Sequence, residues 1–302
     1  MDFALRADEP VAAGLRRIAR AEVEAALADV DQPEDRGIEE SVHDLRKRCK
    51  QLRAVARIVR PHLGRAYAPT NAAFRDAARQ LSAVRDTQVL VEVLDGLVSG
   101  GLAGDAAAPV QEVLAARHRT VTDSLAADPA PFDRARSLLE VGWRHVEGWD
   151  LADGSGFDLL AGGIRRSYAG ARRAARRCRD EATTEDLHEW RKRTKDHWYH
   201  LRLLHGSAPA LLEPWIEQVH ALSDALGDDH DLAVLAGTLQ ADPLGHGGDA
   251  VVGAVRRAVE VRRAELQERA GRLGGRVTAE HPDAVVDRLR LWWDAWHREG
   301  AP

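Results

Sequence analysis

The segment HDLRKRCK, from His43 to Lys50, recurs 145 residues later as HEWRKRTK, from His188 to Lys195. The chain has only four lysines among 43 lysine and arginine residues, and all four stand at matching positions of these two segments. We call the shared pattern H-[DE]-x-R-K-R-x-K the basic motif. Two matching cationic clusters predict one binding surface, built twice, for a strongly anionic ligand.

The similarity between the two halves extends beyond the basic motif. At the same offset Leu81 matches Leu226 and Asp86 matches Asp231, with no gap across that stretch. Similarity that continues outside a motif indicates an internal duplication. We therefore expect one domain over residues 5–298, with half-repeats at 5–148 and 157–298 and a junction at 149–156.

The pattern of apolar residues predicts an all-α fold. Alanine and arginine are abundant and aromatic residues scarce, which favours helix over sheet. Apolar residues recur at three- and four-residue spacing, and short connections predict antiparallel bundles. The expected helices span residues 11–30, 38–63, 70–98, 107–127, 132–147, 157–180, 184–205, 210–239, 248–273 and 282–298.

On a helix, each basic motif divides into an apolar face and a cationic face. The cations of the first copy fall within an arc of roughly 100°, with Arg53 at its edge, and Leu45 and Leu52 lie opposite. In the second copy Tyr199 and Arg202 continue the cationic face. A third basic run, from Arg165 to Arg179, has seven arginines and no acid, and Tyr168 shares its predicted arginine face.

Bulk composition excludes several classes of protein. The net charge of −5 argues against a nucleic-acid protein with a basic bulk. No apolar run approaches the roughly 20 residues of a membrane helix, and no leader opens the chain, so we expect a cytoplasmic protein without a membrane partner. Cys49 and Cys178 do not make a disulfide framework, and we expect both to be small buried or half-buried residues.

These residues resemble the CHAD family, the conserved histidine α-helical domain. The resemblance rests on the doubled basic motif, supported by the segments that end in Asp86 and Asp231 and by Arg117 and Arg262, and it covers residues 5–297. It implies two helical bundles related by a pseudo-twofold, with basic helices lining a central groove or pore. It also implies binding of inorganic polyphosphate and association with polyphosphate granules. Some members carry a fused triphosphatase domain, whose signature is absent here because no lysine follows Glu24.

The predicted polyphosphate-binding residues combine the basic faces with this resemblance. They are His43, Arg46, Lys47, Lys50, Arg53, Arg57, Arg117, Arg165, Arg166, Arg172, Arg173, Arg176, His188, Arg191, Lys192, Lys195, Tyr199, Arg202 and Arg262. We expect no catalytic residue, no metal and no cofactor.

Two other functions stay open at this point: a phosphotransfer or polyphosphate-metabolising enzyme, and a nucleic-acid-binding module. His43 or His188 could accept a phosphoryl group, although no Gly-rich phosphate loop or acidic metal pair lies in the repeat. RNA or DNA could bind, although nucleic-acid surfaces usually add exposed aromatics, and here only Tyr168 and Tyr199 lie on the basic faces. Binding to nucleic acid is expected to be weak and non-specific, from charge alone.

Metal binding is disfavoured by the arginines and lysines around the motif histidines. His197 and His200 stand three residues apart, and the segment from Gly227 to Asp231 is acidic and contains His230. That segment could hold a hard cation, or it is simply a loop or helix start rich in acids. Asp86 and Asp231 either hold a motif histidine or arginine in place or serve as helix caps or structural ion pairs.

Overall fold

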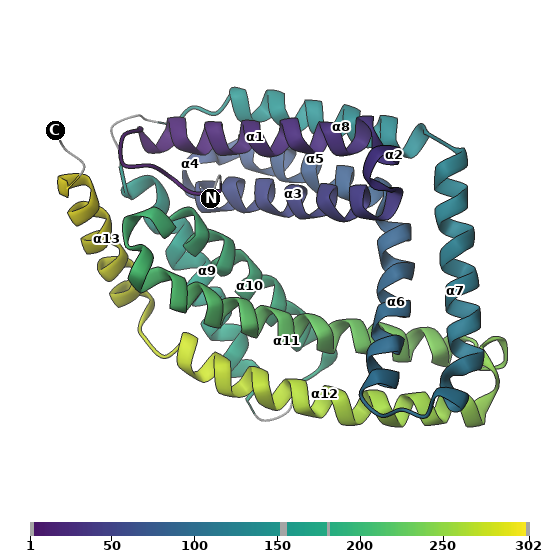
Figure 1. The fold of residues 1–302 in the computed structure, drawn as a ribbon. Helices are drawn as coiled ribbons and strands as arrows, with labels where there is room; N and C mark the ends of the chain where they lie inside the picture. The colour runs from purple at the N-terminus through teal and green to yellow at the C-terminus, as the bar shows by residue number, and fades with distance from the viewer. Residues whose placement is uncertain (1–2, 152–155, 180–181, 300–302) are drawn as a thin grey trace.

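The computed structural model describes residues 3–151, 156–179 and 182–299, and all regular structure in these ranges is helical (Figure 1). The all-α prediction is confirmed. Part of the predicted junction at 149–156 lies outside the described residues. The longer helices are α1 (Val11–Asp31), α3 (Ile38–Ile58), α5 (Tyr67–Gln80), α6 (Ser82–Ser99), α7 (Gly104–Ala127), α8 (Ala130–Glu147), α9 (Asp158–Arg177), α10 (Thr184–Leu203), α11 (Pro209–Ala241), α12 (Asp249–Val277) and α13 (Pro282–Glu299).

Short elements fill the connections between these helices. Proline and glycine, the residues expected to end helices, start or close most of them. They are α2 (Pro33–Arg36), α4 (Arg60–Leu63) and 3-10 turns at Gly64–Ala66, His205–Ser207 and Leu244–His246. Every predicted helical segment is found, with its ends shifted by a few residues.

Two predicted segments are divided in the structure. The segment 38–63 ends as α3 at Ile58, because Pro61 enters the first turn of α4. The segment 70–98 breaks at Leu81, which leaves the helical conformation with φ −115° and ψ 16°. Leu81 is buried, and no proline or glycine stands there, so packing rather than local sequence breaks the helix. The matching residue Leu226 lies inside the continuous helix α11.

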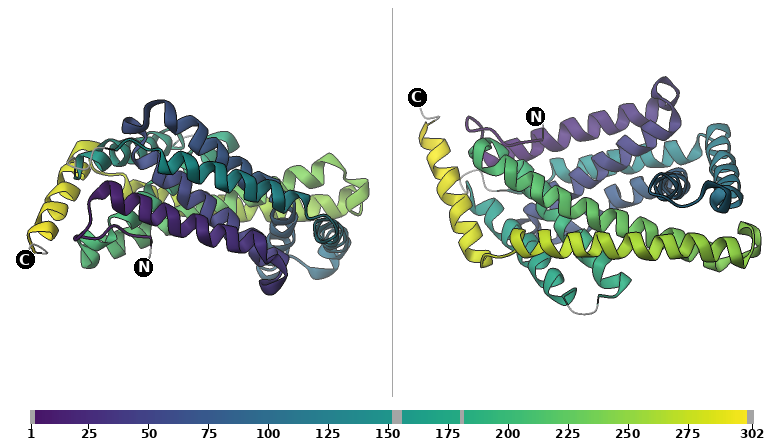
Figure 2. Two further views of the ribbon diagram at one scale, coloured as in Figure 1. Left: turned by 90° about the horizontal axis from the view of Figure 1, so that it is seen from above. Right: turned by 60° about the horizontal axis from the view of Figure 1, so that its bottom comes forward.

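The helices form two groups joined by a pair of crossing helices. Helices α1, α3, α5 and α8 pack side by side, and α9 to α13 form the second group (Figure 1). Helices α6 and α7 run antiparallel from the first group to the second, where α6 packs on α11 and α7 on α12. The turned views show the same arrangement, with α6 and α7 at one end of the molecule and α13 at the other (Figure 2).

The two groups also meet directly, where α3 packs on α9 and α10. His200 of α10 joins all three helices: its Nε2 donates to the carbonyl oxygen of Ala54, 3.2 Å away, and its Nδ1 lies 2.9 Å from the hydroxyl of Ser167. The backbones of α3 and α9 come unusually close at Gly163. A methyl group added at Gly163 would stand 1.9 Å from the carbonyl oxygen of Ile58.

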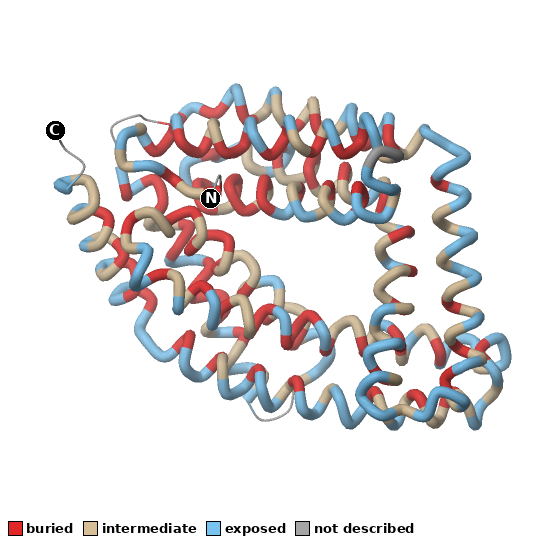
Figure 3. Tube along the Cα trace, in the orientation of Figure 1, coloured by how far each residue is buried: buried red, intermediate tan, exposed pale blue. Residues whose placement is uncertain are grey.

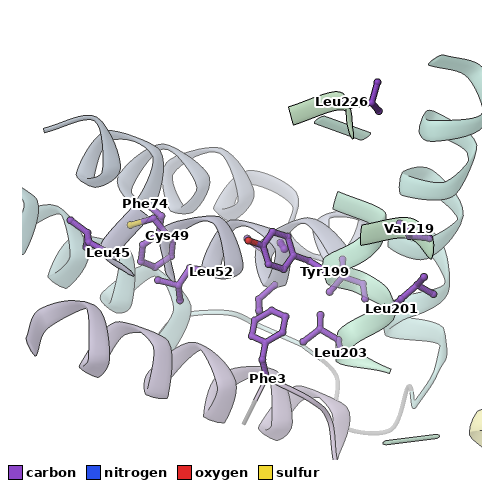
Figure 4. Packing of buried hydrophobic residues seen from close by; sticks show 14 of the residues in the cluster. Phe3, Leu45, Cys49, Leu52, Phe74, Tyr199, Leu201, Leu203, Val219 and Leu226 are labelled. Atoms are coloured by element: carbon purple, nitrogen blue, oxygen red, sulfur yellow. The ribbon is translucent and has the colours of Figure 1, made fainter. Parts of the chain in front are cut away.

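Buried apolar side chains lie where these helices face one another. Leu45, Cys49 and Leu52 of α3 are buried with Phe74 of α5, as the apolar face of the first motif predicts (Figure 4). Burial is densest in α1, α3 and α9 and sparser in α6 and α7 (Figure 3). Cys178 is half-buried, so both cysteines fit their prediction. Within the described ranges no helix combines the length and apolarity of a membrane span.

Gly163→Ala should lower the free energy of unfolding by about 1–3 kcal/mol, because a side chain forced against backbone cannot be accommodated by a rotamer change. Urea denaturation measures the loss. Gly237→Ala is the matched control, since nothing lies within 4 Å of the added methyl group; it should be neutral or stabilise α11 by up to about 1 kcal/mol. Equal effects of the two substitutions would contradict the close approach.

Acid should destabilise the fold through two buried histidines of α10. Burial lowers the pKa of His197 and of His200 to about 3 each, whereas unfolded histidine titrates near 6.5. As pH falls from about 6.5 toward 3, the unfolded chain takes up protons that the folded chain refuses, so stability falls. His197→Leu should reduce the change in urea midpoint between pH 7 and pH 4.5. His62→Leu, at an exposed position, should keep the wild-type change; a His197→Leu profile identical to wild type would refute the argument.

Candidate functional site

The two basic motifs lie on α3 and α10, which contact each other. The apolar residues of both motifs are buried in the core, and residues of their polar faces line two pockets. The first pocket, of about 480 Å³, is lined by His43, Arg46, Lys47, Lys50, Arg85, Asp86, Val89, Arg191, His230, Asp231 and Val234. The second, of about 430 Å³, is lined by Lys50, Arg53, Arg57, Tyr67, Glu189, Arg191, Lys192, Arg193, Lys195, Asp196 and Tyr199.

Lys50 and Arg191 line both pockets, so the two pockets adjoin. We call the two together the motif site. Lys50 comes from the first motif and Arg191 from the second. The structure therefore brings both copies of the motif to one place.

Many cations of the motif site lack a carboxylate partner. Within the described part of the chain, six lysines and arginines of the motif helices make no ion pair: Lys47, Lys50, Arg53, Arg191, Lys195 and Arg202. The first five line the motif site, whereas Arg202 lines neither pocket. Arg53 is held instead by the side-chain oxygen of Asn71, 3.1 Å from its Nε. Such crowding of like charges is unfavourable without an anion.

Burial, and after it this crowding of charges, lowers the pKa of several cations. The Lys50 amine remains accessible to solvent at the pocket, yet protein surrounds it on most sides. Burial, followed by the charges of Arg46, Arg191 and Lys195, lowers the pKa of Lys50 to about 8. Burial also lowers the pKa of Lys195, where Asp224 opposes the shift and Arg191 adds to it. Burial and Arg57 lower the pKa of Arg53 to about 10.

Other predicted cations are already engaged by acids. Arg57 of α3 pairs with Asp196 of α10 at 2.5 Å, and burial raises the pKa of that carboxyl. Lys192 pairs with Glu189 at 2.8 Å on its own helix. The Arg57–Asp196 pair joins the two groups of helices, so its first role is to hold α3 against α10.

Asp86 and Asp231 both face motif cations. An oxygen of Asp86 lies 3.6 Å from the guanidinium of Arg46. Burial raises the pKa of Asp231, and the charge of Arg191 is the largest effect opposing this rise. Both aspartates lie inside helices, α6 and α11, so the helix-cap alternative is wrong. The expectation of a loop or helix start around Asp228 is wrong for the same reason.

Of the two motif histidines, His43 lines the first pocket, whereas His188 lines neither pocket. Burial and the charge of Arg85 lower the pKa of His43. The ring of His188 lies 4.4 Å from that of His230, and burial and His230 lower its pKa. The Nδ1 atoms of His188 and His230 are buried without a partner. His197 and His200 lie in the core, and the described residues include no cluster suited to a metal ion.

The aromatic residues near the motif site are packed against other groups. The Trp198 ring lies 4.6 Å from the Lys195 amine, 4.8 Å from the Arg202 guanidinium and 4.5 Å from the stacked His220 ring. The expectation that Tyr168 and Tyr199 lie exposed on the basic faces is wrong. Tyr199 is 4% exposed and packs against Phe3, and Tyr168 is 1% exposed, with its hydroxyl donating to the carbonyl of Glu280 (Figure 4).

Several predicted residues lie outside the motif site. Arg117 on α7 and Arg262 on α12 line neither pocket, and Arg262 pairs with Glu265 at 2.8 Å. The α9 arginines are also separate. Arg165 pairs with Asp283 on α13, Arg166 and Arg173 are exposed, and Arg172 and Arg176 line a different pocket beside α12.

Arg85 and His230 belong to the site but were not predicted. They stand 145 residues apart, each immediately before the matched aspartate of its half. A basic residue before the matched aspartate in both copies is the signal that could have identified them.

Comparisons with known proteins give a matching family model and a solved structure of similar fold. The family model described as CHAD domain matches residues 11–240. The crystal structure of the CHAD domain from the plant Ricinus communis is similar in fold, with a TM-score of 0.59 and 20% sequence identity over 98% of this chain and 95% of that chain. No curated protein matches the chain. With the family model covering most of its length, the chain belongs to the CHAD domain family.

Proposed function

We propose that this protein binds inorganic polyphosphate at the motif site and does not act on it chemically. The observation that carries the proposal is the set of six lysines and arginines without ion pairs on the two motif helices. They gather in a chain whose acids outnumber its lysines and arginines, 48 to 43. Acids were available for pairing, so the unpaired cations indicate an external anion.

The shape of the site favours a linear polymer over a single phosphate. Two adjoining pockets share Lys50 and Arg191, so an extended polyanion can lie across both and contact cations from both motifs. An isolated phosphate would reach only a part of them. Guanidinium groups bind phosphate oxygens in pairs, and the lysines add compact charges.

The two halves are, in this proposal, copies related by a pseudo-twofold that passes near the first pocket. Four pairs of residues lining that pocket stand 145 residues apart: Arg46 and Arg191, Arg85 and His230, Asp86 and Asp231, Val89 and Val234. Equivalent positions meet in one pocket when copies face each other across such an axis. This supports one domain over 5–298 whose halves share a single groove.

The rival functions have less support. For phosphotransfer, His43 and His188 lack a hydrogen-bonded carboxylate in the described structure that could orient the ring as a base. For nucleic acid, stacking needs an accessible aromatic face, and Trp198 already contacts Lys195, Arg202 and His220. In this proposal the protein is cytoplasmic and associates with polyphosphate granules.

Reversing charge in either half should weaken binding of long-chain polyphosphate at least about tenfold, a loss of 1.4 kcal/mol. The variants are Lys47→Glu with Lys50→Glu, and Lys192→Glu with Lys195→Glu. Calorimetric titration measures affinity, and circular dichroism checks helicity. The wild-type affinity should also fall linearly on a log–log plot against salt concentration, because bound counterions are released.

Arg134→Glu with Arg298→Glu is the control, with the same change in net charge on the exposed outer helices α8 and α13. It should bind almost as the wild type does. If either motif can be reversed without loss, or if affinity is flat with salt, the shared site is refuted.

Affinity for polyphosphate should decrease above pH 8. The pKa of Lys50 is about 8 in the free protein, and a bound polyanion raises it because the charged amine is then favoured. Binding above pH 8 therefore requires proton uptake, whereas below pH 7 the amine is already charged. Calorimetry at pH 8.5 in buffers of different ionisation enthalpy measures the uptake. Lys50→Arg, charged throughout this range, should flatten the pH dependence; a slope equal to wild type would assign it to another group.

A further inference from the structure

A second basic pocket lies between α9, α10 and α12, on the other side of α10 from the motif site. Its volume is about 380 Å³, and we call it the outer arginine pocket. Its wall includes Arg172, Arg176, Arg179, Arg272 and Trp190. It shares no lining residue with either pocket of the motif site.

Trp190 separates the two sites. It belongs to the second basic motif, but its side chain is 3% exposed and points away from the lysines of that motif. Its ring packs so closely on α12 that a methyl group added at Gly274 would stand 2.3 Å from it. Trp190 therefore forms part of the wall of the outer arginine pocket, and neither Lys192 nor Lys195 lines that pocket.

Two arginines of the outer arginine pocket already have hydrogen-bond or ion-pair partners, and two do not. Arg172 is oriented by its Nε, which donates to the carbonyl of Thr278 at 3.1 Å. Arg272 pairs with Glu268, the one acidic residue among the lining residues that the structure describes. Arg176 and Arg179, by contrast, make neither an ion pair nor a hydrogen bond in the described ranges.

The remaining lining groups add no negative charge. Burial raises the pKa of the Cys178 thiol to about 11, so it is protonated at neutral pH. Gln267 is neutral, and its amide donates to Asp229 at 2.8 Å. Two unengaged guanidinium groups beside an oriented third one match the oxygens of a compact phosphate chain.

We propose that the outer arginine pocket is a separate site for a compact polyphosphoryl group, two or three linked phosphates in size. The group could come from an inorganic oligophosphate or from a nucleoside triphosphate, which present the same oxygens. The pocket is enclosed by three helices and does not continue into the motif site, which is why a short chain fits it better than a long polymer. This site does not depend on polyphosphate binding at the motif site.

Titration calorimetry with inorganic triphosphate at fixed salt tests the proposal. Arg176→Glu with Arg179→Glu should weaken triphosphate binding at least about tenfold, while long-chain polyphosphate keeps its affinity for the motif site within a factor of about three. Lys50→Glu with Lys195→Glu should do the reverse. Arg176 and Arg179 are both exposed, so their substitution should preserve the fold, which circular dichroism checks.

Arg269→Glu with Arg276→Glu is the matched control, since both residues are exposed on α12 and neither lines the pocket. It should bind triphosphate as the wild type does. ATP in place of triphosphate distinguishes the sources: equal affinity indicates an inorganic ligand, and tighter binding indicates a nucleotide. Triphosphate binding that survives the Arg176 and Arg179 substitutions, or that is abolished by the Lys50 and Lys195 substitutions, would overturn the proposal.

Discussion

The repulsion among cations where α3 meets α10 is the constraint on which the rest of the structure depends. Burial is the first cause that lowers the pKa of Lys50 and of Lys195, and the charge of Arg191 adds to both shifts. Two helices with such faces would not stay together through those faces. The Arg57–Asp196 ion pair and the apolar faces hold them instead. His200 bonds to Ala54 across the interface, and Gly163 lets α9 approach α3 at backbone distance.

The ion pairs around the site stabilise geometry while leaving its centre charged. Asp196 is half-buried and engages Arg57 between the two groups of helices. Asp86 approaches Arg46 from α6, the helix that crosses from one group to the other. These acids stand at the margins of the two pockets, whereas Lys50 and Arg191, which line both pockets, have no ion-pair partner among the residues that the structure describes. An ion pair between helices that is largely shielded from solvent is costly to break, so the margin of the motif site is held in place while its centre stays charged.

Much of the fold and part of the site could be predicted because both depend on spacing along single helices. The three- and four-residue recurrence gave the helices, and the motif gave two faces that carry Lys47, Lys50, Lys192 and Lys195. The break at Leu81 could not be predicted, because the same position in the second copy, Leu226, is helical. The burial of Tyr199 depends on Phe3, a residue distant in sequence that covers it. The separate position of the α9 arginines depends on the angle at which α9 meets α12.

Differences between the matched positions make the two copies chemically unequal. Arg53 corresponds to Trp198, so a hydrogen-bonded guanidinium in one copy is an aromatic ring beside Lys195 in the other. Asp196 corresponds to Gln51, which is buried and donates to Glu22 instead of a motif arginine. Arg57 consequently has an acid partner, whereas its counterpart Arg202 lies over Trp198 without one. Each motif helix keeps three cations without an ion pair among the described residues. Under the proposed function, a polyanion lying across both copies would therefore meet equal numbers of unpaired cations in different surroundings: a hydrogen-bonded guanidinium at Arg53 in the first copy and the Trp198 ring beside Lys195 in the second.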